Sequence, residues 1–248
     1  MERVVATALE GEKAAVLNAT VAELLAEAEP VARAFEDALD NRPQVGVMGH
    51  WMLHELLRRS QLHDGLVNEL GSPNPVTRAA AARVCGAARL TDSTIWIGDL
   101  VADGNPRVRH AAVRSLGRLG GRRAVEILME SSDEMPLYRL AIELSRAATD
   151  IDIEALMRKP VSEAAAVATV LACGLRRDVL RISPLLGIVH DRRWPKQVRI
   201  AACKSLSAIG DRSAADGLKR LADTDPDDEL RKAADRAHRR LVKRAVAT

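Results

Sequence analysis

Two segments, Arg78-Ala-Ala-Ala-Ala-Arg-Val-Cys-Gly86 and Arg109-His-Ala-Ala-Val-Arg-Ser-Leu-Gly117, share one pattern of an arginine, small residues and an apolar run. Related segments begin at Arg199 and Arg231. Each follows a proline, and the prolines recur at intervals of 24 to 35 residues: Pro43, Pro75, Pro106, Pro136, Pro160, Pro195 and Pro226. Self-similarity at this period predicts a stack of helical repeats, whose usual role is to present a binding surface.

The composition supports helices as the building element. Apolar residues make up 47% of the 248 residues, but aromatic residues only 2%. A core of Ala, Leu, Val and Ile suits thin layers of packed helices. We therefore predict an all-α, right-handed α-solenoid of about six or seven helix pairs. In each pair, helix B starts at or just after the recurring proline, and helix A precedes it, the best A segments being 94–102, 122–132, 151–158, 176–190 and 212–223.

No linker divides the chain, so one continuous domain is expected. Residues 1–59 are predicted to form an N-terminal helical cap and a degenerate first repeat. Residues 60–248 are predicted to form the repeat array. The array closes with a polar capping helix at 227–246, which has acidic residues at its start and basic residues at its end, as the helix dipole favours.

Charge is distributed unevenly along the chain. The net charge is +3, but residues 1–40 carry nine acidic and three basic residues, which leaves +9 for the remainder. When each B helix is aligned on its arginine, with Glu163 at that place in the helix after Pro160, the position five residues later is basic in four of six helices, and the position nine residues later adds two arginines. Five and nine residues after the arginine lie the residues of a basic stripe: Arg83, Arg114, Arg118, Lys204, Arg236 and Arg240. Equal positions of stacked repeats align, so the stripe is predicted to face an acidic partner on the concave side, together with Trp194. The alternative is ordinary solvent-exposed charge in an arginine-rich protein.

A second spacing points to a known family. An aspartate precedes an arginine by six residues in three inter-helix turns: Asp103 and Arg109, Asp133 and Arg139, Asp225 and Arg231. This Asp–x5–Arg pattern resembles the Asp/Arg ladder of HEAT repeats, in the short form first noted in phycobilin lyases. The resemblance implies that each turn aspartate bonds a neighbouring turn or its arginine. The sequence departs from the pattern at Ser72, Arg193 and Glu163, and the last two predict an interruption of the ladder between residues 160 and 199.

No catalytic or metal-binding constellation emerges. His50 and His54 share a helical face with His63 downstream, but apolar neighbours favour half-buried histidines, and no metal or cofactor is expected. Cys203 with His190 as base lacks any residue that would orient the pair.

The remaining signals concern location. The three cysteines, Cys85, Cys173 and Cys203, have no ligand spacing and suit a reducing cytoplasm. The segment from Met1 to Leu9 does not resemble a signal peptide, and no apolar run reaches the roughly 18 residues of a membrane span.

Three functions remain open on the sequence alone. The first is a non-catalytic scaffold or adaptor that binds a partner protein on its concave B-helix face. The second is a nucleic-acid-binding protein related to the HEAT-like alkylpurine DNA glycosylases, for which Trp96, Asp99 and Arg192-Arg193-Trp194 are the candidate residues. Of these, Trp96 is expected in the core and Trp194 at the surface. The third is a lyase-like or chaperone-like factor that acts on a cofactor-bearing protein.

Overall fold

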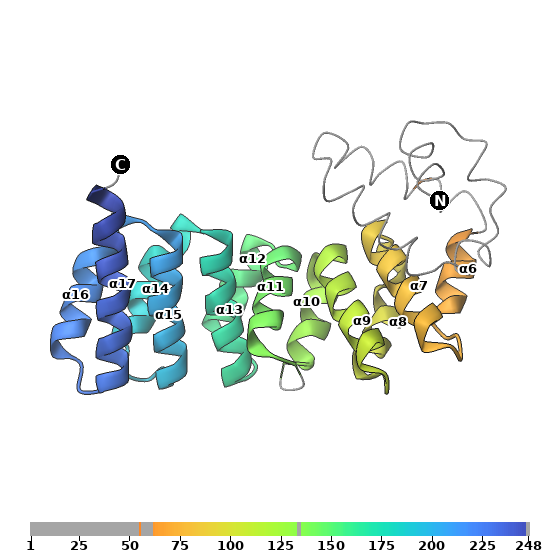
Figure 1. Cartoon of the computed structure of the whole chain (residues 1–248), viewed down its shortest axis with the longest axis horizontal. Helices are drawn as coiled ribbons and strands as arrows, with labels where there is room; N and C mark the ends of the chain where they lie inside the picture. The colour runs from red at the N-terminus through yellow and green to blue at the C-terminus, as the bar shows by residue number, and fades with distance from the viewer. Residues whose placement is uncertain (1–54, 56–61, 133–134, 247–248) are drawn as a thin grey trace. The chain divides into compact units, whose positions relative to one another are not determined.

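The described part of the chain is helical throughout. The computed structural model describes residues 55, 62–132 and 135–246, and within these residues there is no β-strand. The helices alternate between A and B positions, which confirms the predicted all-α solenoid architecture (Figure 1). The predicted boundary at residue 59 lies outside the described residues.

The chain divides into two compact units between Ile127 and Leu128, inside one helix. The first unit contains α6 (Leu62–Glu69), α7 (Pro75–Ala87), α8 (Thr94–Asp99), α9 (Pro106–Leu119) and the start of α10 (Gly121–Glu130), with the 3-10 turns η1 (Thr91–Ser93) and η2 (Leu100–Ala102) around α8. The second unit contains the end of α10, then α11 (Leu137–Ala147), α12 (Asp150–Arg158), α13 (Glu163–Arg176), η3 (Val179–Arg181), α14 (Ile182–His190), α15 (Lys196–Ile209), η4 (Arg212–Ala214), α16 (Ala215–Thr224) and α17 (Asp228–Val246).

The helix starts follow from local chemistry. In α7 and α9 a proline takes the first helical position, where its missing N–H costs nothing. The asparagine before it caps the helix, because the Asn74 side chain accepts from the Val76 N–H and that of Asn105 from the Arg107 N–H. The predicted A segment 176–190 is wrong at its start. Arg176 still belongs to α13, because the left-handed residue Arg177 ends that helix, and α14 begins only at Ile182 after a 3-10 turn.

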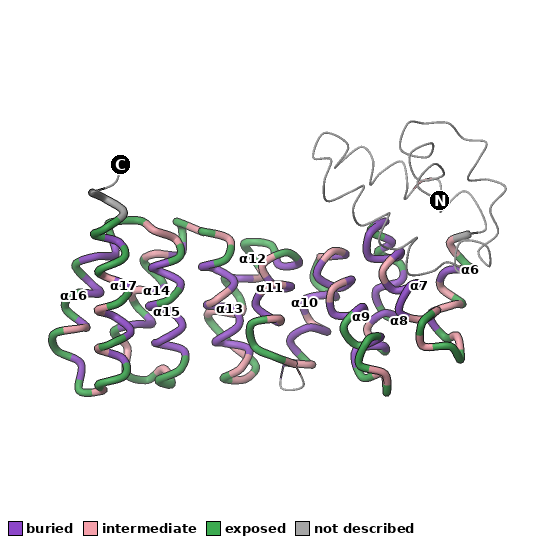
Figure 2. Tube along the Cα trace, in the orientation of Figure 1, coloured by how far each residue is buried: buried purple, intermediate pink, exposed green. Residues whose placement is uncertain are grey.

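Within each unit the B helices pack on one another, and α7, α9, α13, α15 and α17 also pack on the A helix before them. In the second unit, α13 contacts α11 and α15, and α15 contacts α17 (Figure 1). The buried side chains are mainly alanine, valine and leucine, as the composition predicted. Buried stretches run along the B helices, and exposed residues gather at the turns (Figure 2).

Neighbouring B helices approach closely at a glycine. A Cβ atom on Gly86 of α7 would lie 2.7 Å from the Ser115 Cα of α9, and one on Gly174 of α13 would lie 2.8 Å from the Ser205 Cα of α15. At both crossings the serine Oγ donates to a carbonyl of the preceding B helix, four residues before the glycine, at 2.7 and 2.8 Å. Only glycine permits this approach, so the Gly–Ser contact sets the spacing and the register of the two helices.

This contact corrects the predicted alignment of α13. Gly86 lies eight residues after Arg78, so the equivalent Gly174 places Ala166, and not Glu163, at the reference position. The helix ends agree, because a left-handed residue stands eleven residues after the reference in α7, α9 and α15, and Arg177 stands eleven after Ala166. The three extra residues lie before α13, which begins three residues after Pro160, and three residues are nearly one helical turn, so both alignments bring small residues to the same face.

Candidate functional site

The turn before each of three B helices is fastened by an arginine of that helix. Arg109 Nη1 donates to the carbonyl oxygens of Asp103 at 2.8 Å and Gly104 at 3.2 Å. Arg78 and Arg231 donate in the same way to the carbonyls six and five residues before them. The arginine of the Asp–x5–Arg pattern therefore binds the backbone of its own turn.

The aspartate side chain instead reaches the arginine of the preceding repeat. Asp103 pairs with Arg78 through two bonds, Nε to Oδ2 at 2.8 Å and Nη2 to Oδ1 at 3.1 Å. Asp225 accepts from Arg199 Nη2 at 2.5 Å, and both side chains are under one-tenth exposed. These bonds join consecutive repeats and fix the angle at which the B helices stand. Asp133 lies outside the described residues, and Arg139 donates to Glu143 within its own helix.

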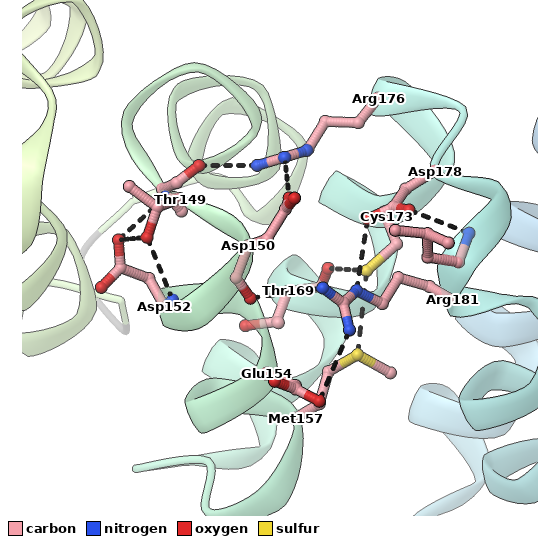
Figure 3. Close-up of polar contacts among 12 residues, drawn as sticks. Thr149, Asp150, Asp152, Glu154, Met157, Thr169, Cys173, Arg176, Asp178 and Arg181 are labelled. Carbon is pink, nitrogen blue, oxygen red and sulfur yellow. Dashed lines mark hydrogen bonds and ion pairs between the residues drawn. The ribbon is translucent and has the colours of Figure 1, made fainter.

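The segment where an interruption was expected is linked differently (Figure 3). Arg176 donates to the Ala148 carbonyl at 2.6 Å and to the Asp150 carboxylate. Arg181 donates to the Asp150 carbonyl at 3.3 Å and to the Asp178 carboxylate at 3.2 Å. Arg176 at the end of α13 and Arg181 in η3 thus hold the turn before the A helix α12, whereas the ladder bonds join turns that precede B helices.

The carboxylates of the ladder, Asp103 and Asp225, should make the free energy of unfolding depend on pH. The hydrogen bond from Arg78 holds the pKa of Asp103 below its ordinary value. Burial alone would raise the pKa of Asp225, but the Asp227 N–H and Arg199 outweigh it and lower the pKa. Both groups therefore contribute stability at pH values above about 3.9, the pKa of an aspartate in the unfolded chain, and that contribution is lost as pH falls through the lower folded pKa.

Between pH 5 and 2, the free energy of unfolding measured in urea should fall less steeply in Asp103→Asn and in Asp225→Asn than in wild type. Parallel curves would contradict this.

The Gly174–Ser205 contact and the Arg199–Asp225 bond hold α13, α15 and α17 side by side, and the C-terminal halves of these helices line a groove of about 600 Å³. Four cationic side chains line it: Arg177 at the end of α13, Lys204 on α15, and Arg240 and Lys243 on α17. The remaining lining residues are Gly174, Leu175, Ser207 and Ala208. We call these eight residues the cationic groove. None of them is acidic, so the groove can receive a negatively charged group.

The structure distributes the predicted basic stripe between the two units. Lys204 and Arg240 line the cationic groove, and Arg236 is exposed on α17. In the first unit, Arg114 and Arg118 are half-buried on α9, and Arg83 lines a hollow of about 130 Å³ beside Arg107. With the corrected alignment the α13 member five residues after the reference is Leu171, where the earlier alignment gave Ala168. Neither is charged, so the stripe lacks a cation on this helix.

Alignment on one position missed three cations: Arg107, Arg177 and Lys243. Arg107 is the second residue of α9, whereas Arg177 and Lys243 lie eleven and twelve residues after their references. Scanning every position on the same helical face as the stripe would have found Lys243. Nothing in the sequence marks Arg177, because its direction depends on a left-handed backbone conformation.

The tryptophans differ from expectation. Trp96, expected in the core, is 48% exposed, and its neighbour Ile95 is 59% exposed. The short helix α8 turns only Ile97 fully inward, because flanking Leu100 and Val101 belong to a 3-10 turn that supplies the rest of the buried face. Trp194, expected at the surface, is half-buried. Arg193 beside it is paired with Asp191 at 2.9 Å.

Comparison with protein families decides the relationship. The model for HEAT repeats matches residues 63–145 and 153–238, more than half of the 248 residues. The chain belongs to the HEAT-repeat family. No curated protein matches its sequence.

Three solved structures are similar to the HEAT-repeat chain at low identity. Human deoxyhypusine hydroxylase in complex with glycerol is 16% identical, with a TM-score of 0.39 and coverage of 98% of this chain and 97% of that chain. The CpcE–CpcF complex of phycocyanin lyase from Nostoc sp. PCC7120 is 19% identical, with a TM-score of 0.37 and coverage of 82% and 86%. An engineered protein is 18% identical, with a TM-score of 0.28 and coverage of 98% and 96%.

The three cysteine thiols of this HEAT-repeat chain are withdrawn from solvent. Cys85, Cys173 and Cys203 are free and buried. Burial raises the pKa of Cys85 and Cys203 to about 12 and that of Cys173 to about 11, so each thiol stays protonated at neutral pH. Burial and nearby arginines lower the pKa of His190. A thiol held in this form is a poor nucleophile.

Metal-ligand clusters and membrane-spanning helices are both absent from the described residues. No group of three or more His, Cys, Asp or Glu side chains there could hold a metal ion. His50 and His54 lie outside those residues, and His63 contacts Asp64 at 3.1 Å. None of the described helices has the length and apolar character required to cross a membrane.

Proposed function

We propose that this HEAT-repeat protein is a non-catalytic scaffold that binds an acidic partner protein on its B-helix face. The observation that carries the proposal is the cationic groove, where four cations and no carboxylate meet on three adjacent helices. Like charges gathered in a groove reinforce one another's field and attract an acidic surface. The Gly174–Ser205 contact and the Arg199–Asp225 bond hold those helices, so the surface is formed before the partner arrives.

The chemistry of the described side chains favours binding over catalysis. An enzyme that used a cysteine would need a thiolate within reach of substrate, and the three thiols are buried and protonated. The same free thiols suit a reducing compartment. We therefore propose that the protein acts in the cytoplasm.

Nucleic acid is the second candidate, and one observation favours it. Trp96 and Ile95 are exposed side by side on α8, and an exposed aromatic ring can stack on a base. The proposal for protein is preferred because the groove cations lie on helices that carry no exposed aromatic ring in their C-terminal halves.

Charge reversal in the groove should abolish partner capture. The full-length tagged protein would be compared with Lys204→Glu/Arg240→Glu in affinity purification from its native cells. Both side chains are exposed, so folding should hardly change, while repulsion between the new carboxylates and an acidic partner should reduce capture at least about tenfold. Capture would be quantified by mass spectrometry.

The matched control changes two exposed arginines on the A side of the same unit, Arg212→Glu/Arg220→Glu. It alters the net charge by the same amount and should capture the partner as wild type does. Equal loss in both variants, or none in the groove variant, would overturn the proposal. A captured species that is DNA or RNA, with affinity that falls steeply as salt rises, would establish the nucleic-acid function in its place.

A further inference from the structure

We infer that the cationic groove is a recognition site for an acidic peptide segment of the partner, and that Arg177 is the residue that determines its specificity. The inference rests on the proposed function and names the part of the partner that is read. It is carried by a strained arginine, by cations without carboxylate partners, and by the apolar residues that line the groove with them.

Arg177 has a backbone conformation that glycine prefers. Its φ and ψ angles are 51° and 42°, in the left-handed region at the end of α13. The equivalent residues after α9 and α15 are Gly120 and Gly210, as expected where a helix ends in this way. A side chain with a Cβ is disfavoured there. The chain therefore keeps an arginine where glycine would be more stable, and strain of this kind collects at functional sites.

The strained conformation directs a cation into the groove. The Arg177 side chain is exposed and lines the groove beside Lys204 of the next B helix. A second left-handed arginine, Arg89, stands at the same position after α7 with φ 52°, but it lines neither of the two hollows described above. The two arginines share one backbone strain and differ in their surroundings, which makes Arg89 a control for the role of Arg177.

The four groove cations are not neutralised by the acids nearest to them. Asp178, next to Arg177, binds Arg181 instead, and Asp235 on α17 binds Arg239. Among the described residues no carboxylate forms an ion pair with Arg177, Lys204, Arg240 or Lys243. Most of the other surface cations of this unit do have such a partner; Lys196, Lys219 and Lys232 are examples. Charges left together in this way favour an external anion.

Apolar residues line the groove together with the cations, and they favour an anion that also carries an apolar group. Leu175 is 40% exposed, and Ala208 lies beside it in the groove. A volume of about 600 Å³ is large for one small anion and falls in the usual range of ligand sites. A short peptide that alternates carboxylates with a leucine-sized side chain would match both the cations and the apolar residues. A nucleic-acid backbone offers no apolar group for Leu175.

The test uses a defined probe and the full chain. A fluorescent synthetic peptide with the repeat Glu-Asp-Leu would be titrated into wild-type protein, and its Gln-Asn-Leu counterpart would be the uncharged control. The acidic peptide should bind, and the counterpart at least about tenfold more weakly. Lys204→Glu/Arg240→Glu should lose binding. No binding by wild type, or equal binding by this variant, would overturn the inference.

Arg177→Gly gives a readout that a merely structural residue would not. It should raise the melting temperature by about 2–4 °C, because the left-handed strain is relieved, and yet weaken peptide binding several-fold. Arg89→Gly should raise the melting temperature similarly and leave peptide affinity unchanged. If Arg177→Gly binds the peptide as wild type does, the assignment of Arg177 is wrong. Tighter binding of duplex DNA through the same groove residues would overturn the choice of a peptide.

The scaffold function and the peptide site in the groove can each be wrong without the other. If the full chain captures its partner through Lys204 and Arg240 but ignores the peptide, the scaffold function stands and the peptide site is wrong. If the peptide binds in the groove but the groove variant captures the cellular partner normally, the peptide site stands and the proposed route of partner binding is wrong.

Discussion

Replacing Asp225 by alanine should cost about 3–5 kcal/mol of unfolding free energy, the largest single effect expected in this protein. Asp225 and Arg199 are 3% and 9% exposed at their side chains and form a direct pair between consecutive turns. Removing the carboxylate leaves a buried guanidinium that keeps only the Val189 carbonyl, at 2.9 Å. Denaturant unfolding of the purified full-length protein would measure the loss.

A control and a rescue separate burial from charge. Asp223→Ala removes an exposed ion pair with Lys219 and should change stability by no more than about 0.5 kcal/mol. The double variant Arg199→Met/Asp225→Leu should recover most of the loss, because two apolar residues leave no unpaired charge. A cost for Asp225→Ala no larger than that for Asp223→Ala would show that the ladder does not hold the repeats together.

The second large effect is expected at the crossing of α13 and α15. A methyl group on Gly174 would meet the Cα of Ser205 at 2.8 Å, so Gly174→Ala must push two backbones apart. Overpacking of this kind costs about 1–3 kcal/mol, and the separation also strains the bond from Ser205 Oγ to the Val170 carbonyl. Thermal unfolding would show a lower midpoint.

The opposite sign is expected at a glycine with free space. A Cβ on Gly187, in the middle of α14, has nothing within 4 Å. Gly187→Ala should therefore stabilise the protein by about 0.5–1 kcal/mol through helix propensity alone. The pair Gly174→Ala/Ser205→Gly should restore part of the loss at the crossing. If Gly174→Ala and Gly187→Ala change the free energy of unfolding equally, the close contact at Gly174 is refuted.

The repeat architecture was predictable because its causes are local. A proline at a helix start, small residues where helices meet and an aspartate six residues before an arginine all recur in the sequence, and each has a direct structural role at Pro106, Ala111 and Asp103. The partner of the Asp103 carboxylate was less accessible. It is Arg78, 25 residues away, and spacing alone did not distinguish it from Arg109.

Register and surface were harder to derive. The alignment of α13 failed at Glu163 because it was counted from Pro160, whereas packing is set at Gly174, which lies three residues farther from its proline than Gly86 does from Pro75. Trp96 was placed in the core because apolar residues flank it, but a six-residue helix has room for few inward positions. Lys204 and Arg240 were found by alignment, whereas Arg177 required the backbone angle that the structure supplies.

Zero-length cross-linking of the captured complex tests whether the partner binds at the cationic groove. A carbodiimide joins a lysine amine only to a carboxylate in direct contact with it, and Lys204 and Lys243 both line the cationic groove. We expect cross-links from these two lysines to aspartates or glutamates of the partner. The variant Lys204→Arg/Lys243→Arg should lose these cross-links but still capture the partner. Partner cross-links that form only from Lys159, just after the A helix α12, or from Lys219 on the A helix α16 would contradict binding at the B-helix face.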